Sequence, residues 1–171
     1  TVQSDASAAF DKMGVSANQY MAYINKMGSL MKGSGIDTKT AMDLSSQAMQ
    51  RAADVASVMG ISIESAMESI AGAAKGNFTM MDNLGVAMNA TTLEAYALEK
   101  GIKKPYKEME NAQKIQLAMQ MFLEKSAHAA KNYEKENQTF AGSLNTVRAS
   151  FKNLLSGAGT IEDFMCSLTG C

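Results

Sequence analysis

The segment DTKTAMDLSSQAMQRAADVASVMG, residues 37–60, carries the clearest helical pattern in the chain. Asp37 is a residue type that favours a helix N-cap, and Gly60 is typical of a helix end. Between them, apolar residues recur every three or four positions on one face: Ala41, Leu44, Ala48, Ala52, Val55 and Met59. The opposite face is polar, with Asp43, Gln47, Gln50, Asp54 and Ser57. This spacing predicts an amphipathic helix that buries mainly alanine and methionine.

The composition extends the helical prediction to the rest of the 171 residues. There are 15 methionines and one proline, alanine is abundant, and the β-branched and aromatic residues that favour strands are sparse. We therefore expect an all-α protein. The length suits one core, or one compact part with an extended arm.

Glycines divide residues 1–104 into short helices. The stretch KGNFTMMDNLGVAMNATTLEAYALEKGI, residues 75–102, combines polar turns with compact apolar groups. Its glycines and capping residues predict a tight helical corner over 76–102. The expected structural turns lie at Gly60, Gly76, Gly85, Gly101 and Pro105. Short helices are only marginally stable alone, so we expect 1–104 to form a compact helical bundle.

A different pattern begins at Pro105. Apolar residues recur every seven positions, with a second row three or four residues later, which is a heptad-like pattern. It predicts one long amphipathic helix over 105–157, or two such helices separated by a break at the polar run 131–139. Residues 158–171 are expected to form a short flexible tail. The expected helix-association seam comprises Ile115, Met119, Phe122, Tyr133, Phe140, Leu144, Val147, Phe151 and Leu154.

Few residues indicate chemistry. His128 is the only histidine, and its neighbours include no partner at a spacing typical of catalysis or metal binding. Cys166 and Cys171 form a C-x-x-x-x-C pair without further His or Cys nearby, which is no zinc signature. The P-loop, Rossmann and G-x-S-x-G motifs are absent from the sequence. We therefore expect no catalytic residues, no cofactor and no metal, and we do not expect an enzyme.

The net charge and the methionine content indicate which binding partners are expected. A formal net charge of −1 gives no general attraction to nucleic acid, and clustered arginine is missing, so we expect no sequence-specific nucleic-acid binding. No apolar run approaches the length of a membrane-spanning helix. The methionines favour a core role, because they alternate with alanine at helical steps. The alternative is a Met-rich helical module that binds a protein or peptide in an adaptable groove.

Residues 52–102 resemble the tape measure proteins, or minor tail proteins, of tailed bacteriophages and prophages. In that family a helix ending in a D-x-A-S pattern precedes a capped helix with G-A-x-x-G, a leucine-glycine corner and a helix closing on G-I. Residues 111–125 and 137–157 look like the family's two-part helical exit. The corresponding residues of the first region are Asp54, Ala56, Ser57, Gly72, Ala73, Gly76, Leu84, Gly85, Leu93, Ala97, Gly101 and Ile102.

The resemblance implies a structural role in a phage or prophage tail. Proteins of this family form extended helical multimers that set tail length, template tube assembly and leave the tail when DNA is ejected. The implied partners are other copies of the chain, tail tube proteins, distal tail or baseplate proteins and tail assembly chaperones. The implied location is the virion tail, assembled in the cytoplasm of the bacterial host. Since the chain begins at Thr1 rather than Met, we expect it to have been cut from a longer protein or processed.

Overall fold

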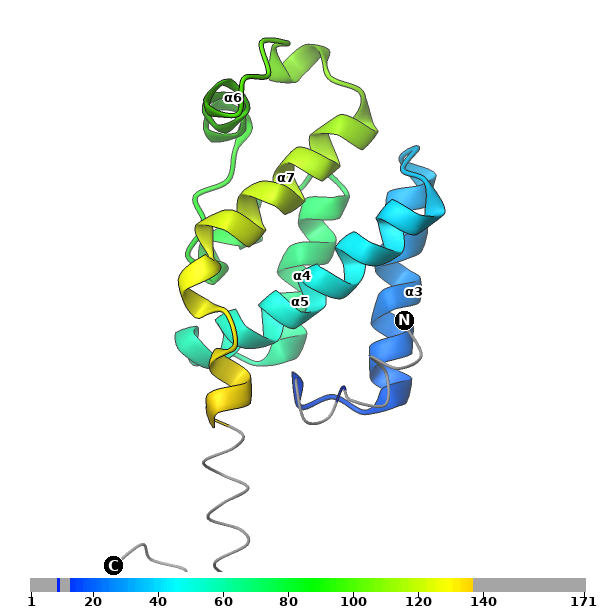
Figure 1. Cartoon of the computed structure of the whole chain (residues 1–171), viewed down its shortest axis with the longest axis vertical. Coiled ribbons are helices and arrows are strands. Elements are labelled where there is room, and N and C mark those ends of the chain that lie inside the picture. The colour runs from blue at the N-terminus through cyan, green and yellow to red at the C-terminus, as the bar shows by residue number, and fades with distance from the viewer. Residues whose placement is uncertain (1–8, 10–12, 137–171) are drawn as a thin grey trace, which may run out of the picture. The chain divides into compact units, whose positions relative to one another are not determined.

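The computed structural model describes residue 9 and residues 13–136, and each regular element in this part of the chain is a helix (Figure 1). The all-α prediction is therefore confirmed. The chain divides into a compact unit, Thr1–Tyr133, and a second unit, Glu134–Cys171. Of the second unit, the described residues are 134–136, which belong to a helix that begins at Asn132.

Helices α3 (Ala17–Gly33) and α4 (Thr38–Met59) pack against each other. The carboxylate of Asp37 accepts a hydrogen bond from the backbone N–H of Thr40 at 3.0 Å, which satisfies a donor that has no partner within α4. At the other end, Gly60 has a φ of 68°, a left-handed conformation that glycine adopts without strain. The ends predicted for this helix are confirmed. Helix α4 also contacts the later helix α7, so it lies at the centre of the compact unit (Figure 1).

Alanine and methionine fill much of the core. Ala41, Ala48 and Ala52 of α4 have no exposed surface, which allows neighbouring helices to approach closely. Methionine is unbranched and fills the irregular spaces that remain. The buried methionines are Met13, Met27, Met31, Met49, Met67, Met81, Met88, Met109, Met119 and Met121. Met59 is an exception to its predicted inward position, because it ends α4 and remains 42% exposed.

Helix α5 (Ile63–Ala74) precedes the predicted corner, which contains the 3-10 helix η1 (Thr79–Leu84) and α6 (Ala90–Glu99). Asn89 caps α6 by accepting a hydrogen bond from the backbone N–H of Thr92 at 3.0 Å. Helix α5 packs against α4 and η1. The glycines expected at turns follow the ends of helices and have positive φ values: Gly60, Gly76, Gly85 and Gly101.

The structure corrects the prediction of a helix running on from Pro105. Pro105 precedes a short 3-10 helix, η2 (Tyr106–Glu108), and α7 begins only at Asn111 because Met109 is extended. Helix α7 (Asn111–Lys125) then ends, and a second 3-10 helix, η3 (Ala127–Ala129), follows. The break covers residues 126–131, so it begins earlier than the predicted 131–139 and overlaps that range only at Lys131. Residues 137–157 and the predicted tail 158–171, with Cys166 and Cys171, lie outside the described residues.

The compact unit also extends beyond the predicted bundle 1–104. Helix α7 packs against α4, α5 and α6, and its apolar face completes their core. Met119 and Phe122 have no exposed surface. The boundary therefore falls after Tyr133 rather than after residue 104, because the bundle would otherwise lack one wall of its core.

Candidate functional site

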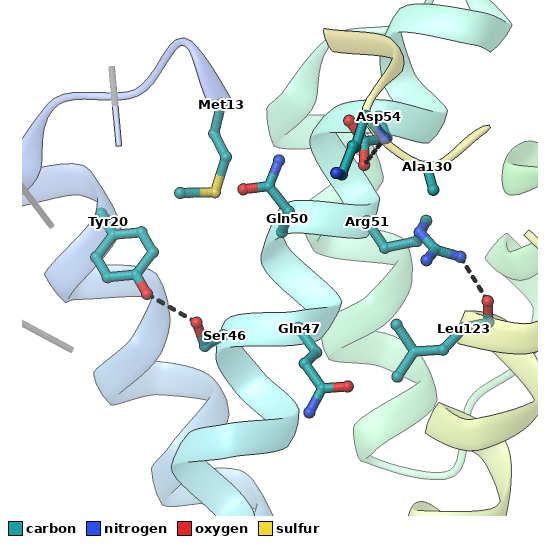
Figure 2. A pocket seen from close by; sticks show the side chains of 10 residues that line it. Met13, Tyr20, Ser46, Gln47, Gln50, Arg51, Asp54, Leu123 and Ala130 are labelled. Atoms are coloured by element: carbon teal, nitrogen blue, oxygen red, sulfur yellow. Dashed lines mark hydrogen bonds between the residues drawn. The ribbon is translucent and has the colours of Figure 1, made fainter. Parts of the chain in front are cut away.

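Polar groups gather where α4 meets the turn that follows α7. We call this region the α4–turn junction and define it as three residues of α4 together with their contacts in the turn. The α4 residues are Arg51, Asp54 and Ser57, and the turn residues are Ser126, Lys131, Asn132 and Tyr133. Figure 2 shows Arg51 and Asp54 directed from α4 toward the chain around Leu123 and Ala130.

Asp54 is the central residue of the junction. The residue is only 2% exposed, and its carboxylate accepts two backbone hydrogen bonds, from Lys131 N–H at 2.9 Å and from Tyr133 N–H at 3.2 Å. A carboxylate placed at the start of a helix satisfies free N–H groups and interacts favourably with the helix dipole. Asp54 therefore caps the helix that begins at Asn132, although it lies 77 residues before Lys131 in the sequence. The prediction that Asp54 lies on an exposed polar face is wrong.

Arg51 holds the other side of the same turn. Its Nη1 atom donates to the backbone carbonyl of Leu123 and to the hydroxyl of Ser126. The last carbonyls of a helix lack partners within it, and a cation there complements the negative end of the helix dipole. Ser126 is fully buried and donates its own hydrogen bond to the carbonyl of Phe122. Arg51 and Ser126 together satisfy the end of α7.

The backbone between these contacts adopts an unusual conformation. Lys131 has a φ of 63°, and it is the only non-glycine residue with positive φ among residues 9 and 13–136. Asn132 donates from its side-chain amide to the hydroxyl of Ser57 at 3.0 Å. A left-handed conformation costs an L-residue roughly 1–2 kcal/mol, so the neighbouring contacts must offset it.

A cavity of about 410 Å³ lies beside the junction, between α3, α4 and the turn (Figure 2). The hydroxyls of Tyr20 and Ser46 are 3.0 Å apart across it. Its groups can hydrogen-bond water or a neighbouring backbone segment, while Arg51 and Asp54 already bind the turn. The contacts of Arg51 and Asp54 therefore fix the conformation of the turn that follows α7. The lining residues are Met13, Tyr20, Ser46, Gln47, Gln50, Arg51, Asp54, Leu123, Ala130 and Lys131.

A second polar cluster joins α6 to α7. The Tyr96 hydroxyl donates to one carboxylate oxygen of Glu124 at 2.7 Å, and Lys100 donates to the other at 2.8 Å. The hydrogen bond from Lys100, followed by that from Tyr96, lowers the pKa of Glu124 below its ordinary value. Burial, followed by the hydrogen bond to Glu124, raises the pKa of Tyr96. The cluster therefore favours an ionised Glu124 and a neutral Tyr96 near neutral pH.

The Glu124 cluster predicts a pH-dependent contribution to stability. Because the pKa of Glu124 is lower in the folded chain, its contribution is present above the ordinary carboxyl pKa and is lost as the pH falls through the lowered value. We expect Glu124→Gln to lower the urea midpoint at pH 7, and the difference from the wild type to shrink as the solution is acidified. Glu108→Gln, on the exposed η2 turn, is the control for loss of one carboxylate. A difference that stays constant at every pH would contradict this assignment.

The structure separates the predicted association seam into three groups. Ile115, Met119 and Phe122 are buried in the core of the compact unit, so they are not available for association while the unit is folded. Tyr133 is half-buried and packs against the same core. This part of the prediction is corrected, because α5 and the other helices already cover that face of α7. The remaining positions lie outside the described residues: Phe140, Leu144, Val147, Phe151 and Leu154.

The described residues contain no arrangement that would hold a metal ion. Among residues 9 and 13–136, no group of three or more His, Cys, Asp or Glu side chains is placed for coordination. His128 lies on η3 and is exposed. Among the helices in the same part of the chain, none is both long and apolar enough to cross a membrane.

One signal in the sequence could have identified Asp54. Its neighbours Ala52, Ala53, Val55 and Ala56 are small or apolar on every side of the helix, and all four are buried. A helix that is apolar all round is surrounded by other elements, so a carboxylate within it needs a partner. The local sequence does not indicate that the partner is a turn far along the chain.

Comparisons with known proteins found no matching family model, no matching curated protein and no matching solved structure.

Proposed function

We propose that this chain is a structural segment of a phage or prophage tail, of the tape measure type, without catalytic activity. In this role it would associate with copies of itself and with tail tube and distal tail proteins. It would help to set tail length, serve as a template for tube assembly and leave the tail at DNA ejection. Its location would be the virion tail.

The observation that carries the proposal is the arrangement of residues 52–102. The segment that resembles tape measure proteins contains the end of α4, then α5, η1 and α6, with glycines at the intervening turns. Most of its apolar side chains are buried in a shared core of small and flexible residues. A unit of this kind is consistent with a structural role, because its side chains pack in the core or cap helix ends.

The burial of α7 in the compact unit changes which residues are expected to mediate self-association. Three members of the predicted seam are buried in α7, so self-association would depend on the apolar heptad positions beyond the compact unit. Those positions repeat through residues 140–154, where Phe140, Val147 and Leu154 are seven residues apart. Apolar residues at this spacing are typical of helices that associate.

Analytical ultracentrifugation of the chain 1–171 tests the proposal. We expect the wild type to self-associate and a Leu144→Lys, Phe151→Lys double variant to sediment as a monomer, because charge in a heptad seam opposes association. Leu98→Lys is the matched control, since Leu98 is 59% exposed on α6 and its substitution should leave association unchanged. Circular dichroism should remain helical in all three. A wild type that stays monomeric and fails to bind purified tail tube protein would refute the proposal.

The alternative, a Met-rich groove for a protein or peptide, has less support. Such a groove requires methionines at an accessible surface. Within the described residues most methionines are buried, and those exposed by more than a third are Met59 at 42% and Met80 at 37%. The methionines therefore serve mainly as core residues here.

A further inference from the structure

The sequence at the end of α7 contains no glycine or proline that would stop a helix. Residues 111–136 include neither glycine nor proline, and the stretch KSAHAAK, residues 125–131, is rich in alanine and lysine, which favour helix. Yet α7 ends at Lys125, Ala130 is extended with ψ 130°, and Lys131 has φ 63°. The local sequence favours a continuous helix, so tertiary contacts must impose the break.

The contacts made by α4 occupy the backbone groups that a continuous helix would use. In such a helix, the carbonyl of Leu123 would pair with the N–H of residue 127, and the N–H of Lys131 with the carbonyl of that residue. Instead, Arg51 donates to the Leu123 carbonyl, and Asp54 accepts from the N–H of Lys131. Asp54 also accepts from Tyr133, whose N–H would otherwise pair with the carbonyl of residue 129. The Leu123 carbonyl can accept two hydrogen bonds, but each N–H is a single donor. The Asp54 contacts of Lys131 and Tyr133 and the continuous helix therefore exclude each other.

Within residues 126–129, the side chains that are buried in the core are small. Ser126 and Ala129 are buried, whereas Ala127 and His128 are exposed. A helical segment would move Ser126 and Ala129, but it would relieve the conformation at Lys131 and pair the backbone internally. The charged side chains of α4 thus bind a segment whose backbone has two alternative hydrogen-bonding patterns.

We propose that residues 126–131 are a conformational switch. With Arg51 and Asp54 bound, the segment is a turn; when these contacts are lost, it becomes helical and joins α7 to the helix that begins at Asn132. The row of residues spaced by seven along this chain, Met119, Ser126 and Tyr133, would then continue through one helix. This inference does not rest on the proposed tail function.

Nuclear magnetic resonance of the full chain tests the switch at Ala130. We expect Asp54→Ala to move the Ala130 Cα resonance to a helical value and to give contacts between Ala127 Hα and Ala130 Hβ, both missing in the wild type. The matched control is Lys131→Gly, because glycine accepts positive φ and disfavours helix. It should keep the wild-type Ala130 shift, and added to Asp54→Ala it should reduce the helical shift.

Each result decides the proposal. A helical Ala130 in Asp54→Ala, with the resonances of α3 and α5 unchanged, supports the switch. A non-helical Ala130 in a folded variant overturns it. Where Asp54→Ala unfolds the compact unit, Asp54→Asn, which keeps the side-chain size and one acceptor oxygen, is read in the same way. Unfolding of both variants also overturns the proposal, since Asp54 would then maintain the whole unit.

Discussion

Replacing Phe122 with alanine is expected to lower the free energy of unfolding by about 3–5 kcal/mol. Phe122 lies in α7 and has no exposed surface, and its ring is among the largest fully buried side chains of the described core. Removing the ring loses the favourable free energy of transferring it from water into the core. It also leaves a cavity that the neighbouring helices fill only in part. Since small domains are typically stable by about 5–15 kcal/mol, the variant should be close to unfolding.

Urea unfolding followed by circular dichroism measures the effect of Phe122→Ala. The matched control is Leu98→Ala, because Leu98 is also apolar and helical but 59% exposed; its effect should stay within about 0.5 kcal/mol. The same pair distinguishes a core residue from an association seam. A Phe122→Ala chain that unfolds at the wild-type urea concentration, yet no longer self-associates, would place Phe122 in an interface and reject the core assignment.

Gly14→Ala is expected to destabilise the compact unit by about 2–4 kcal/mol, for two separate reasons. Gly14 has φ 69°, a conformation that alanine adopts only with strain. In addition, a β-carbon at this position would overlap the hydroxyl of Tyr133 and lie 2.8 Å from its Cζ atom. The aromatic ring of Tyr133 would have to shift, next to the backbone N–H that Asp54 binds.

Gly33→Ala is the control for Gly14→Ala. Gly33 ends α3, its φ is not in the left-handed region, and an added β-carbon would meet no atom within 4 Å. Because alanine favours helix over glycine, this change should stabilise the chain by up to about 1 kcal/mol. Thermal unfolding of both variants should therefore shift in opposite directions. Equal shifts would mean that neither the backbone conformation of Gly14 nor its contact with Tyr133 matters.

Much of the fold follows from local sequence. Asp37 and Gly60 define α4, because capping and left-handed glycine conformations depend on neighbouring residues alone. The turns of the 76–102 corner are predictable on the same basis. The extent of the helix after Pro105 is not, since its heptad-like pattern fits both a long helix and a short helix with a buried face. Only the packing of α7 against α4, α5 and α6 distinguishes them.

Local sequence alone predicts that this protein is helical, where most of its early helices begin and end, and that alanine and methionine supply much of its core. The end of α7 and the burial of Asp54 depend on tertiary packing. Helix caps and apolar periodicity can be predicted because they act between residues close in sequence. The Asp54 contact, in contrast, joins a carboxylate to backbone N–H groups 77 and 79 residues away, which meet it only after the helices have packed.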